Sequence, residues 1–322
     1  MNKAICTAIG AIIMFCSNTQ AAEYTETLKP EAWNPINLVV VQADAPELLG
    51  IANSAKLPMR EQPAQAVSTS ALEVLDTGEA WGYATLWSLV LAITVFTLFT
   101  WINGPVRLAN GFSGIKIKRW SSTDLLIHWL GAIACLALIL TGIVIAGGRY
   151  FLIDWMSAYS WNNFIASSIS IHNFFAIPFV IGWLVMTIKW ARKQLPESCD
   201  FAWFKSLGGY LNFGPLKDSH PDAGFANAGE KLWFWCFALF GAVLVVSGLA
   251  LMYPEAMTLA KGTMMWMLVL HCISAIILGV FTVVHIFMAT LISEGGMENM
   301  VSGCCDENWA KQHHNLWHKQ IR

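Results

Sequence analysis

From residue 80 onward, five long apolar segments alternate with polar links. They comprise residues 80–102, 122–147, 163–190, 231–253 and 263–292. Each segment exceeds the roughly 20 residues with which a helix crosses about 30 Å of hydrocarbon. A span of this kind must be helical, because lipid offers the backbone no other hydrogen-bond partner. The pattern therefore predicts an all-α membrane protein with five transmembrane helices.

Composition supports the membrane class. The chain is 56% hydrophobic and 12% charged, and it contains 16 Trp, whereas soluble domains average about 25% charged residues. A soluble globular protein is therefore excluded.

The first 79 residues follow a different pattern. Lys3 precedes an apolar stretch at about residues 4–15, too short to span, and Thr19 and Ala21 follow as small residues. Residues 1–22 are predicted to be a cleaved secretory signal; an uncleaved anchor is the alternative. Residues 23–79 mix Pro, Ala, Ser and acidic residues, which indicates a loosely ordered periplasmic arm.

The distribution of Lys and Arg predicts the orientation. The links at residues 103–121 and 191–230 and the tail after residue 292 are basic, whereas the two opposite links carry only Arg149 and Lys261. Basic links face the cytoplasm. We therefore expect a multi-pass protein of the bacterial inner membrane, with a periplasmic mature N-terminus and a cytoplasmic C-terminus.

Four histidines lie inside the predicted spans. His271 and His285 are 14 residues apart in one span, which puts them within about 40° on one helix face and about 21 Å apart along it. The orientation places His172 and His271 near the periplasm, and His128 and His285 near the cytoplasm. The histidines therefore form two predicted pairs at two depths.

Bis-histidine ligation of two haems is the simplest chemistry for these pairs. The pattern therefore predicts an all-α transmembrane protein that holds two haems between its helices, with residues 293–322 as a cytoplasmic tail. Histidines that only hydrogen-bond neighbouring helices are one alternative. A proton relay is another, although such relays usually recruit carboxylates, and here Asp124 and Glu294 lie near span ends.

The cysteines do not suggest a metal site of their own. The sequence has no CxxC spacing for structural zinc and no CxxCH for covalent haem attachment. Cys304 and Cys305 are adjacent in the tail, where a solvated pair is expected.

Several stretches between residues 118 and 317 carry a family resemblance. They are Arg119-Trp-Ser-Ser-Thr-Asp-Leu-Leu-Ile-His128-Trp129, Ile171-His172-Asn-Phe-Phe, Asn227-Ala-Gly-Glu-Lys231, the pair His271 and His285, Gly295-Gly-Met-Glu-Asn-Met300 and Trp309-Ala-Lys-Gln-His-His314. Together they resemble the cytochrome b (gamma) subunit of membrane-bound formate dehydrogenase. The histidine pair alone also fits hydrogenase and thiosulfate reductase cytochromes b. The resemblance implies a four-helix transmembrane di-haem cytochrome b bundle at residues 103–292, with residues 80–102 as an extra N-terminal transmembrane helix. The signal, the arm and this first span depart from the family's four-span form.

The resemblance implies roles for individual residues. Residues matching His172 and His271 hold the periplasmic-side haem b in the family, and those matching His128 and His285 hold the cytoplasmic-side haem b. The quinone site uses residues matching Asn227 and Gly229, beside His285. Glu230 departs from the family pattern there and either alters proton supply or caps a helix, since Asn227 with Glu230 at the third helical position is also a capping box.

The resemblance also implies partners. Formate would be oxidised on a molybdenum or tungsten subunit, and electrons would reach this chain through an iron–sulfur subunit on their way to menaquinone or ubiquinone. A cytochrome b subunit of a hydrogenase or another molybdoenzyme is the nearest alternative. A membrane anchor or channel without haem is the alternative from a different class.

Overall fold

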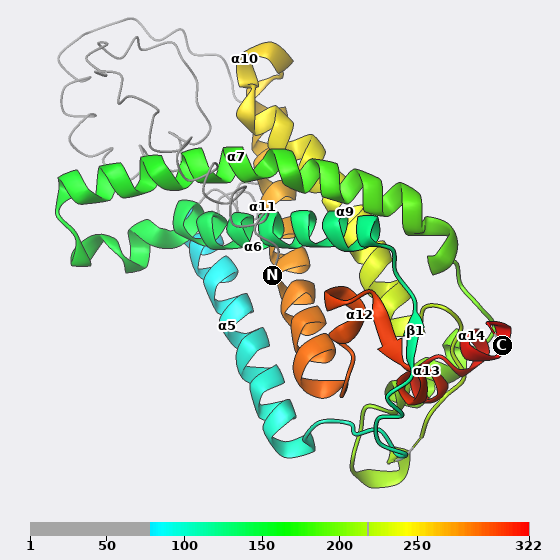
Figure 1. Cartoon of the computed structure of the whole chain (residues 1–322). Helices are drawn as coiled ribbons and strands as arrows, with labels where there is room; N and C mark the ends of the chain where they lie inside the picture. Colours follow the sequence, from blue (N-terminus) through cyan, green and yellow to red (C-terminus); the bar gives the residue numbers. More distant parts are fainter. Residues whose placement is uncertain (1–77, 218, 322) are drawn as a thin grey trace, which may run out of the picture. The chain divides into compact units, whose positions relative to one another are not determined.

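The computed structural model describes residues 78–217 and 219–321, and within them five long helices dominate (Figure 1). These helices are α5 (Gly78–Asn103), α6 (Ser122–Phe151), α7 (Ala158–Trp190), α9 (Ala228–Met252) and α11 (Lys261–Phe287), the last continued by the π-helical η5 (Met288–Ile292). All five are long and apolar enough to cross a membrane. The predicted spans are therefore confirmed as helices, and the chain is a multi-pass membrane protein. The predicted signal and arm lie outside the described residues.

Polar side chains cap the starts of two of these helices. Ser121 caps α6 and exchanges a capping box with Asp124, and Ser157 caps α7. Because a capping side chain replaces the missing intrahelical partner of a first-turn N–H group, the helix can begin at that residue. The helix α7 therefore starts five residues before its predicted apolar segment at residue 163.

The long helices pack as neighbours along the chain. The helix α6 lies against α7, and α9 lies against α11, while α5 contacts both α6 and α11. Small residues permit two of these approaches. A Cβ added to Gly182 of α7 would lie 2.8 Å from the Cα of Gly131 in α6, and one added to Gly82 of α5 would lie 2.6 Å from the Cα of Gly147 in α6. Such close backbone contact is typical of membrane helices, where packing rather than hydrophobic exclusion drives association.

Three segments far apart in sequence fold together at one end of these helices, and we call them the cap: residues 104–121, 191–227 and 293–321. Strand β1 (Lys116–Lys118) pairs antiparallel with β2 (Cys304–Asp306). Around the strands lie α8 (Asp200–Lys205), α12 (Glu298–Val301), α13 (Glu307–His313) and α14 (Asn315–Gln320), with the short turns η2 (Ala191–Gln194), η3 (Leu207–Gly209) and η4 (Gly214–Leu216). Figure 1 shows α10 (Pro254–Met257), at the opposite end of α9, far from α13 and α14. The three basic segments predicted to share one membrane face thus share one end of the helices.

Side-chain amides tie the cap to the helix ends. Nδ2 of Asn103, the last residue of α5, donates to the carbonyl of Tyr210 at 3.0 Å, and its Oδ1 accepts from the backbone N–H of Asn212 at 2.8 Å. The backbone N–H of Ala223 donates to Oδ1 of Asn315 at 3.1 Å. These bonds use polar groups that lipid could not satisfy.

The cap corrects the prediction for the adjacent cysteines. Cys305 is 0% exposed and belongs to a small core with Leu108, Trp309 and Trp317. Its place in β2 turns the side chain inward, whereas Cys304 faces the other side of the strand, because successive strand residues alternate between faces. Burial raises the pKa of the Cys305 thiol to about 11. The predicted solvated pair is therefore wrong for Cys305.

Candidate metal centres

The four span histidines meet as two pairs. His128 of α6 faces His285 of α11 with the ring centroids 6.4 Å apart, and His172 of α7 faces His271 of α11 at the same 6.4 Å. Each ring is half-buried. The helix α11 supplies one histidine to each pair, so the partners in space are those expected from depth.

The separation of each pair fits one metal ion between two imidazoles. Ring nitrogens bound on opposite sides of one ion at about 2 Å each would hold the two ring centroids roughly 6.3 Å apart, since each nitrogen lies about 1.1 Å from its own centroid. The spacing therefore suits bis-imidazole coordination.

Hydroxyl groups orient both rings of the His172/His271 pair. Thr141 Oγ1 lies 2.9 Å from Nδ1 of His172, and Ser247 Oγ lies 3.0 Å from Nδ1 of His271. Each hydroxyl also donates its own hydrogen to the carbonyl four residues earlier in its helix, at 2.7 Å for Thr141 and 2.6 Å for Ser247. A metal ligand whose other ring nitrogen is hydrogen-bonded has a defined tautomer.

A glycine stands beside each of these rings. A Cβ added to Gly142 would lie 3.6 Å from Cε1 of His172, and one added to Gly248 would lie 3.3 Å from Cε1 of His271. Cε1 is bonded to both ring nitrogens, so a side chain at either glycine would crowd a group bound at Nε2. The pair thus provides room for a planar group as well as two ligands.

The His128/His285 pair has different surroundings. His285 stacks on Trp233 of α9, with ring centroids 4.9 Å apart and an angle of 14° between planes. Nδ1 of His128 is buried and has no hydrogen-bond partner among the described residues. This pair is held by aromatic packing rather than by hydroxyls.

The segment predicted to bind quinone forms the first turn of α9. Asn227 Oδ1 accepts from the backbone N–H of Glu230 at 2.9 Å, and the Glu230 carboxylate accepts from the backbone N–H of Asn227 at 3.2 Å. The capping box considered from the sequence is therefore present. Gly229 packs against Trp203, since a Cβ added there would lie 2.7 Å from the indole. In the described part of the chain, Nδ2 of Asn227 makes no hydrogen bond.

Arg119 joins three of the stretches that carry the family resemblance. Its guanidinium, with 3% of the side chain exposed, bonds the Glu230 carboxylate at 3.0 Å and Asn299 Oδ1 at 3.3 Å. The same group lies 3.4 Å from Nε2 of His314, which accepts because its Nδ1 lies 2.9 Å from the carbonyl of Gly224. Rings of Trp120, Phe225, Trp309 and Trp317 surround it at 5.0–5.8 Å.

Two adjacent histidines of the cap are held neutral. Burial lowers the pKa of His313 to about 3, and the charges of neighbouring groups contribute less. His314 is 0% exposed, and burial followed by the Arg119 charge lowers its pKa well below the ordinary value. Both tail histidines are therefore neutral at physiological pH, and His314 uses its two ring nitrogens in hydrogen bonds.

Two acidic side chains near α8 are bound by one lysine. Glu197, Cys199 and Asp200 offer ligand atoms within 4.8 Å of one another. However, the Lys231 ammonium binds both carboxylates at 2.8 Å. This group therefore serves to fasten α8 to the start of α9.

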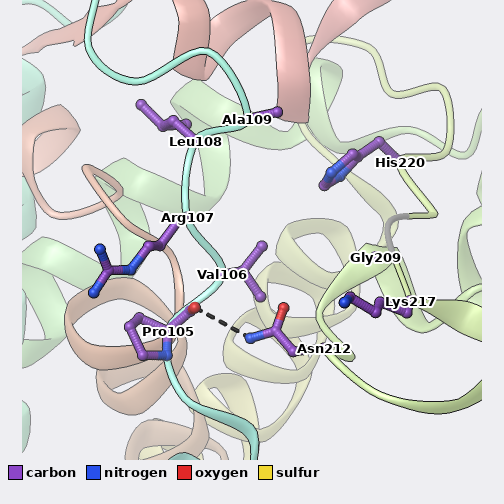
Figure 2. A pocket seen from close by; sticks show the side chains of 9 residues that line it. All are labelled: Pro105, Val106, Arg107, Leu108, Ala109, Gly209, Asn212, Lys217 and His220. Atoms are coloured by element: carbon purple, nitrogen blue, oxygen red, sulfur yellow. Dashed lines mark hydrogen bonds between the residues drawn. The ribbon is translucent and has the colours of Figure 1, made fainter.

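A pocket in the cap contains none of the predicted site residues. Figure 2 shows it between residues 105–109 and a wall that includes Lys217 and His220, with Asn212 Nδ2 donating to the carbonyl of Pro105 at 3.1 Å. Its lining lies at the end of α5 and in the link before α9, away from the histidine pairs.

Sequence reasoning missed the residues that support the histidines. Thr141 and Ser247 were not singled out, nor was Trp233. One signal was available, because each hydroxyl residue directly precedes a glycine inside an apolar span, at Thr141-Gly142 and Ser247-Gly248. Trp233 offered no such signal among 16 Trp.

Comparison with known proteins adds independent information. The chain is 28% identical over 152 residues to the formate dehydrogenase, nitrate-inducible, cytochrome b556(Fdn) subunit of Escherichia coli K12, which covers 47% of this chain and 69% of that protein. It is 25% identical over 207 residues to the formate dehydrogenase cytochrome b556(fdo) subunit of the same organism, covering 64% of this chain and 93% of that protein.

A family model agrees with these relatives. The model described as prokaryotic cytochrome b561 matches residues 119–303, a range that includes all four paired histidines and most of the cap residues around Arg119. Cytochromes of the b type carry haem, and the spacing, tautomer and glycine clearance above fit that group. The chain belongs to the prokaryotic cytochrome b561 family.

Proposed function

We propose that this chain is the membrane-anchoring cytochrome b subunit of a formate dehydrogenase complex. Two relatives carry that name, and the family model covers the histidine-bearing helices. In this role the four helices α6, α7, α9 and α11 form the di-haem bundle, and α5 is an additional transmembrane helix. The catalytic and iron–sulfur subunits are the expected partners.

The single observation that carries the proposal is that one helix, α11, supplies one histidine to each of two histidine pairs. His271 and His285 lie on one face of α11, about 21 Å apart along its axis, and each faces a partner at 6.4 Å. His172 and His271 would hold one haem b, and His128 and His285 the other. When bound, the two haems supply one-electron chemistry at two depths of the membrane.

The residues around each pair have separate tasks. Thr141 and Ser247 fix Nδ1–H of their histidines, so that Nε2 is free to bind iron. Trp233 holds the ring of His285 by stacking. The apolar helices exclude water from both sites, which favours electron transfer over side reactions.

The direction of transfer follows from the cap. Its three segments are the basic ones, so the positive-inside rule puts the cap and the nearby His128/His285 pair on the cytoplasmic side. Formate oxidation on a periplasmic partner would then send electrons inward to a quinone that takes protons from the cytoplasm. Negative charge would move inward, which builds membrane potential.

A quinone site at Asn227, Gly229 and His285 is the least direct part of the proposal. The capping box uses Oδ1 of Asn227 and leaves its amide N–H groups available. Gly229 belongs to the first turn of α9, whose N–H groups have no intrahelical partner. Trp233, four residues or about one turn after Gly229 in α9, stacks on His285. In this proposal a quinone carbonyl accepts hydrogen bonds from these two donors, at the end of α9 whose next turn contacts the His285 ring.

The haem assignment is tested by ligand removal. We expect His172→Ala and His271→Ala each to lose one of two haems, and His128→Ala and His285→Ala to lose the other, because one imidazole cannot complete a bis-histidine site. The pyridine haemochrome assay of the purified complex gives the count, and redox titration shows which haem remains. His318→Ala, in the cap, is the matched control and should keep both haems. Full haem content in His271→Ala would overturn that ligand assignment.

The quinone assignment is tested with Asn227→Asp. Asp caps a helix about as well as Asn, so α9 should be unchanged, while the amide donor is lost and a negative charge is added. We expect both haems to remain and to be reduced by formate, with their reoxidation by a menaquinone analogue at least tenfold slower in stopped-flow absorbance. An unchanged rate would leave Asn227 with capping alone.

The identity of the partners is tested directly. If the complex oxidises hydrogen or another donor rather than formate, mass spectrometry of the subunits that copurify with this chain will show it. That outcome would move the chain to the alternative of a hydrogenase or other molybdoenzyme subunit without changing the haem assignment.

A further inference from the structure

We propose that Thr141 and Ser247 are positioning residues that lower the reduction potential of the haem held by His172 and His271 relative to the haem held by His128 and His285. The inference rests on the proposed haem ligation. It concerns two hydroxyls that touch the ligands and not the iron.

Proton counting determines the direction of both hydrogen bonds. A hydroxyl has one hydrogen, and in Thr141 and Ser247 that hydrogen goes to the carbonyls of Ala137 and Val243. A carbonyl has no hydrogen to return. The contacts of 2.9 Å and 3.0 Å to the imidazoles therefore require Nδ1 to donate and the hydroxyl oxygen to accept.

An accepting hydroxyl makes its imidazole a stronger electron donor. Partial transfer of the Nδ1 proton toward the oxygen raises the basicity of Nε2, the atom that binds iron. Each hydroxyl is a better acceptor than usual because its own hydrogen is engaged by a carbonyl, and hydrogen bonds in such chains reinforce one another. A more basic ligand stabilises the oxidised iron and so lowers the potential.

The arrangement is repeated on two helices. Thr141-Gly142 in α6 serves His172 of α7, and Ser247-Gly248 in α9 serves His271 of α11. In each case the hydroxyl meets Nδ1 and the following glycine leaves space beside Cε1, with a would-be Cβ at 3.6 Å or 3.3 Å. Ser247 is 1% exposed, so no water competes for its oxygen. A hydroxyl residue followed by a glycine therefore contacts each of the two histidines of this site.

The other pair lacks this support. Within residues 78–217 and 219–321, no hydroxyl group hydrogen-bonds the ring of His128 or His285, and the buried Nδ1 of His128 has no partner. Trp233 stacks on His285 but offers its ring no acceptor in that stacked geometry. His172 and His271 are thus more basic ligands than His128 and His285. Electron transfer from the haem of the first pair to the haem of the second is therefore thermodynamically favourable.

The test uses spectroelectrochemical titration of the purified complex. Thr141→Val and Ser247→Ala remove the hydroxyls with little change of volume. We expect two haems in each variant, an upward shift in the potential of one haem, and a larger upward shift of the same haem in the double variant. Ser247→Thr keeps a hydroxyl and should restore the wild-type value.

Two matched controls separate tuning from packing. Ser168 of α7 and Thr282 of α11 each donate to the carbonyl four residues earlier at 2.8 Å and are buried, but among the described residues neither hydrogen-bonds a histidine. Ser168→Ala and Thr282→Val should leave both potentials unchanged. If Ser247→Ala loses one haem while Ser168→Ala and Ser247→Thr keep both, the hydroxyl is needed to hold the ligand, and the potential is then tested with Thr141→Val alone, where an unchanged value would overturn the proposal.

Unchanged potentials in Thr141→Val, Ser247→Ala and the double variant, with two haems present, would overturn the proposal. An equal shift of both haems would overturn it as well. Failure of the haem assignment itself would instead appear as full haem content in His271→Ala, so the two failures are distinguishable.

Discussion

The apolar helices and the cap differ in how they bury polar groups. Between the helices, contacts are made by small residues such as Gly131 and Gly182, and the hydroxyls bond carbonyls of their own helix, with Thr141 also meeting a histidine. In the cap, a buried arginine gathers charged, amide and aromatic partners from all three segments. The helices need close backbones because lipid does not drive them together, whereas the cap needs complete hydrogen bonding because its chain is irregular.

This difference predicts which substitutions should destabilise each region. The helices should tolerate loss of a surface side chain but not an added one at a glycine contact. The cap should tolerate changes at its rim but not the loss of one central partner. Three variants sharpen this contrast, in order of expected effect.

The largest effect is expected from Arg119→Met. Removing the guanidinium leaves Glu230, Asn299 and His314 without their shared partner, and breaking a buried network costs about 3–5 kcal/mol. We expect the tail after residue 292 to become protease-sensitive while the helices keep their helical circular dichroism. Lys193→Met is the matched control, because that exposed cation lies over the Trp120 and Phe225 rings as well but should contribute under about 1 kcal/mol. Equal protease resistance of Arg119→Met and wild type would contradict a central role.

Gly182→Leu should have the next largest effect, and on the helices rather than the cap. The added side chain meets the Gly131 backbone at 2.8 Å from its first carbon, and overpacking of this kind costs up to about 3 kcal/mol. Urea unfolding in detergent micelles measures the loss, and haem content should fall with it. Its neighbour Ile181 is 50% exposed, so Ile181→Leu should behave like wild type. A neutral Gly182→Leu would show that α6 and α7 can separate.

A smaller, pH-dependent effect is expected from His313 in the cap. Its folded pKa of about 3 lies below the ordinary 6.5, so the unfolded chain binds a proton first as the pH falls. Stability is complete above pH 6.5 and is lost as the pH falls toward 3, by about 2 kcal/mol at pH 5. His314, His220, Glu230 and Arg119 influence this group.

The measurement for His313 is hydrogen exchange of α13 between pH 7 and pH 5. His313→Gln should reduce the loss of protection because Gln does not titrate. The protection of α11, corrected for the intrinsic exchange rate, should not change over this range. Loss of protection that is the same in His313→Gln and wild type would assign the pH dependence to other groups.

Much of the site could be predicted from sequence because the positions of its histidines follow the helix period. Hydropathy located the spans, and the 14-residue interval in α11 placed His271 and His285 on one face at two depths. Charge in the links then predicted which depth each partner shares. The pairs at 6.4 Å follow this arithmetic. The prediction for Cys305 failed because its burial depends on β2 pairing with β1, and these two strands lie almost 190 residues apart in the chain.

The amino-acid sequence alone was enough to predict the set of helices, the relative depths of the span histidines and the capping box that starts α9, because these depend on span length, helix period and local residue type. Only the tertiary structure decided that Thr141 meets His172, that Ser247 meets His271, and that Arg119 meets Glu230 and His314. Those contacts join separate helices or segments, and their distances depend on how side chains from each fill the space between them. No local pattern encodes that space, because it exists only once the helices have packed.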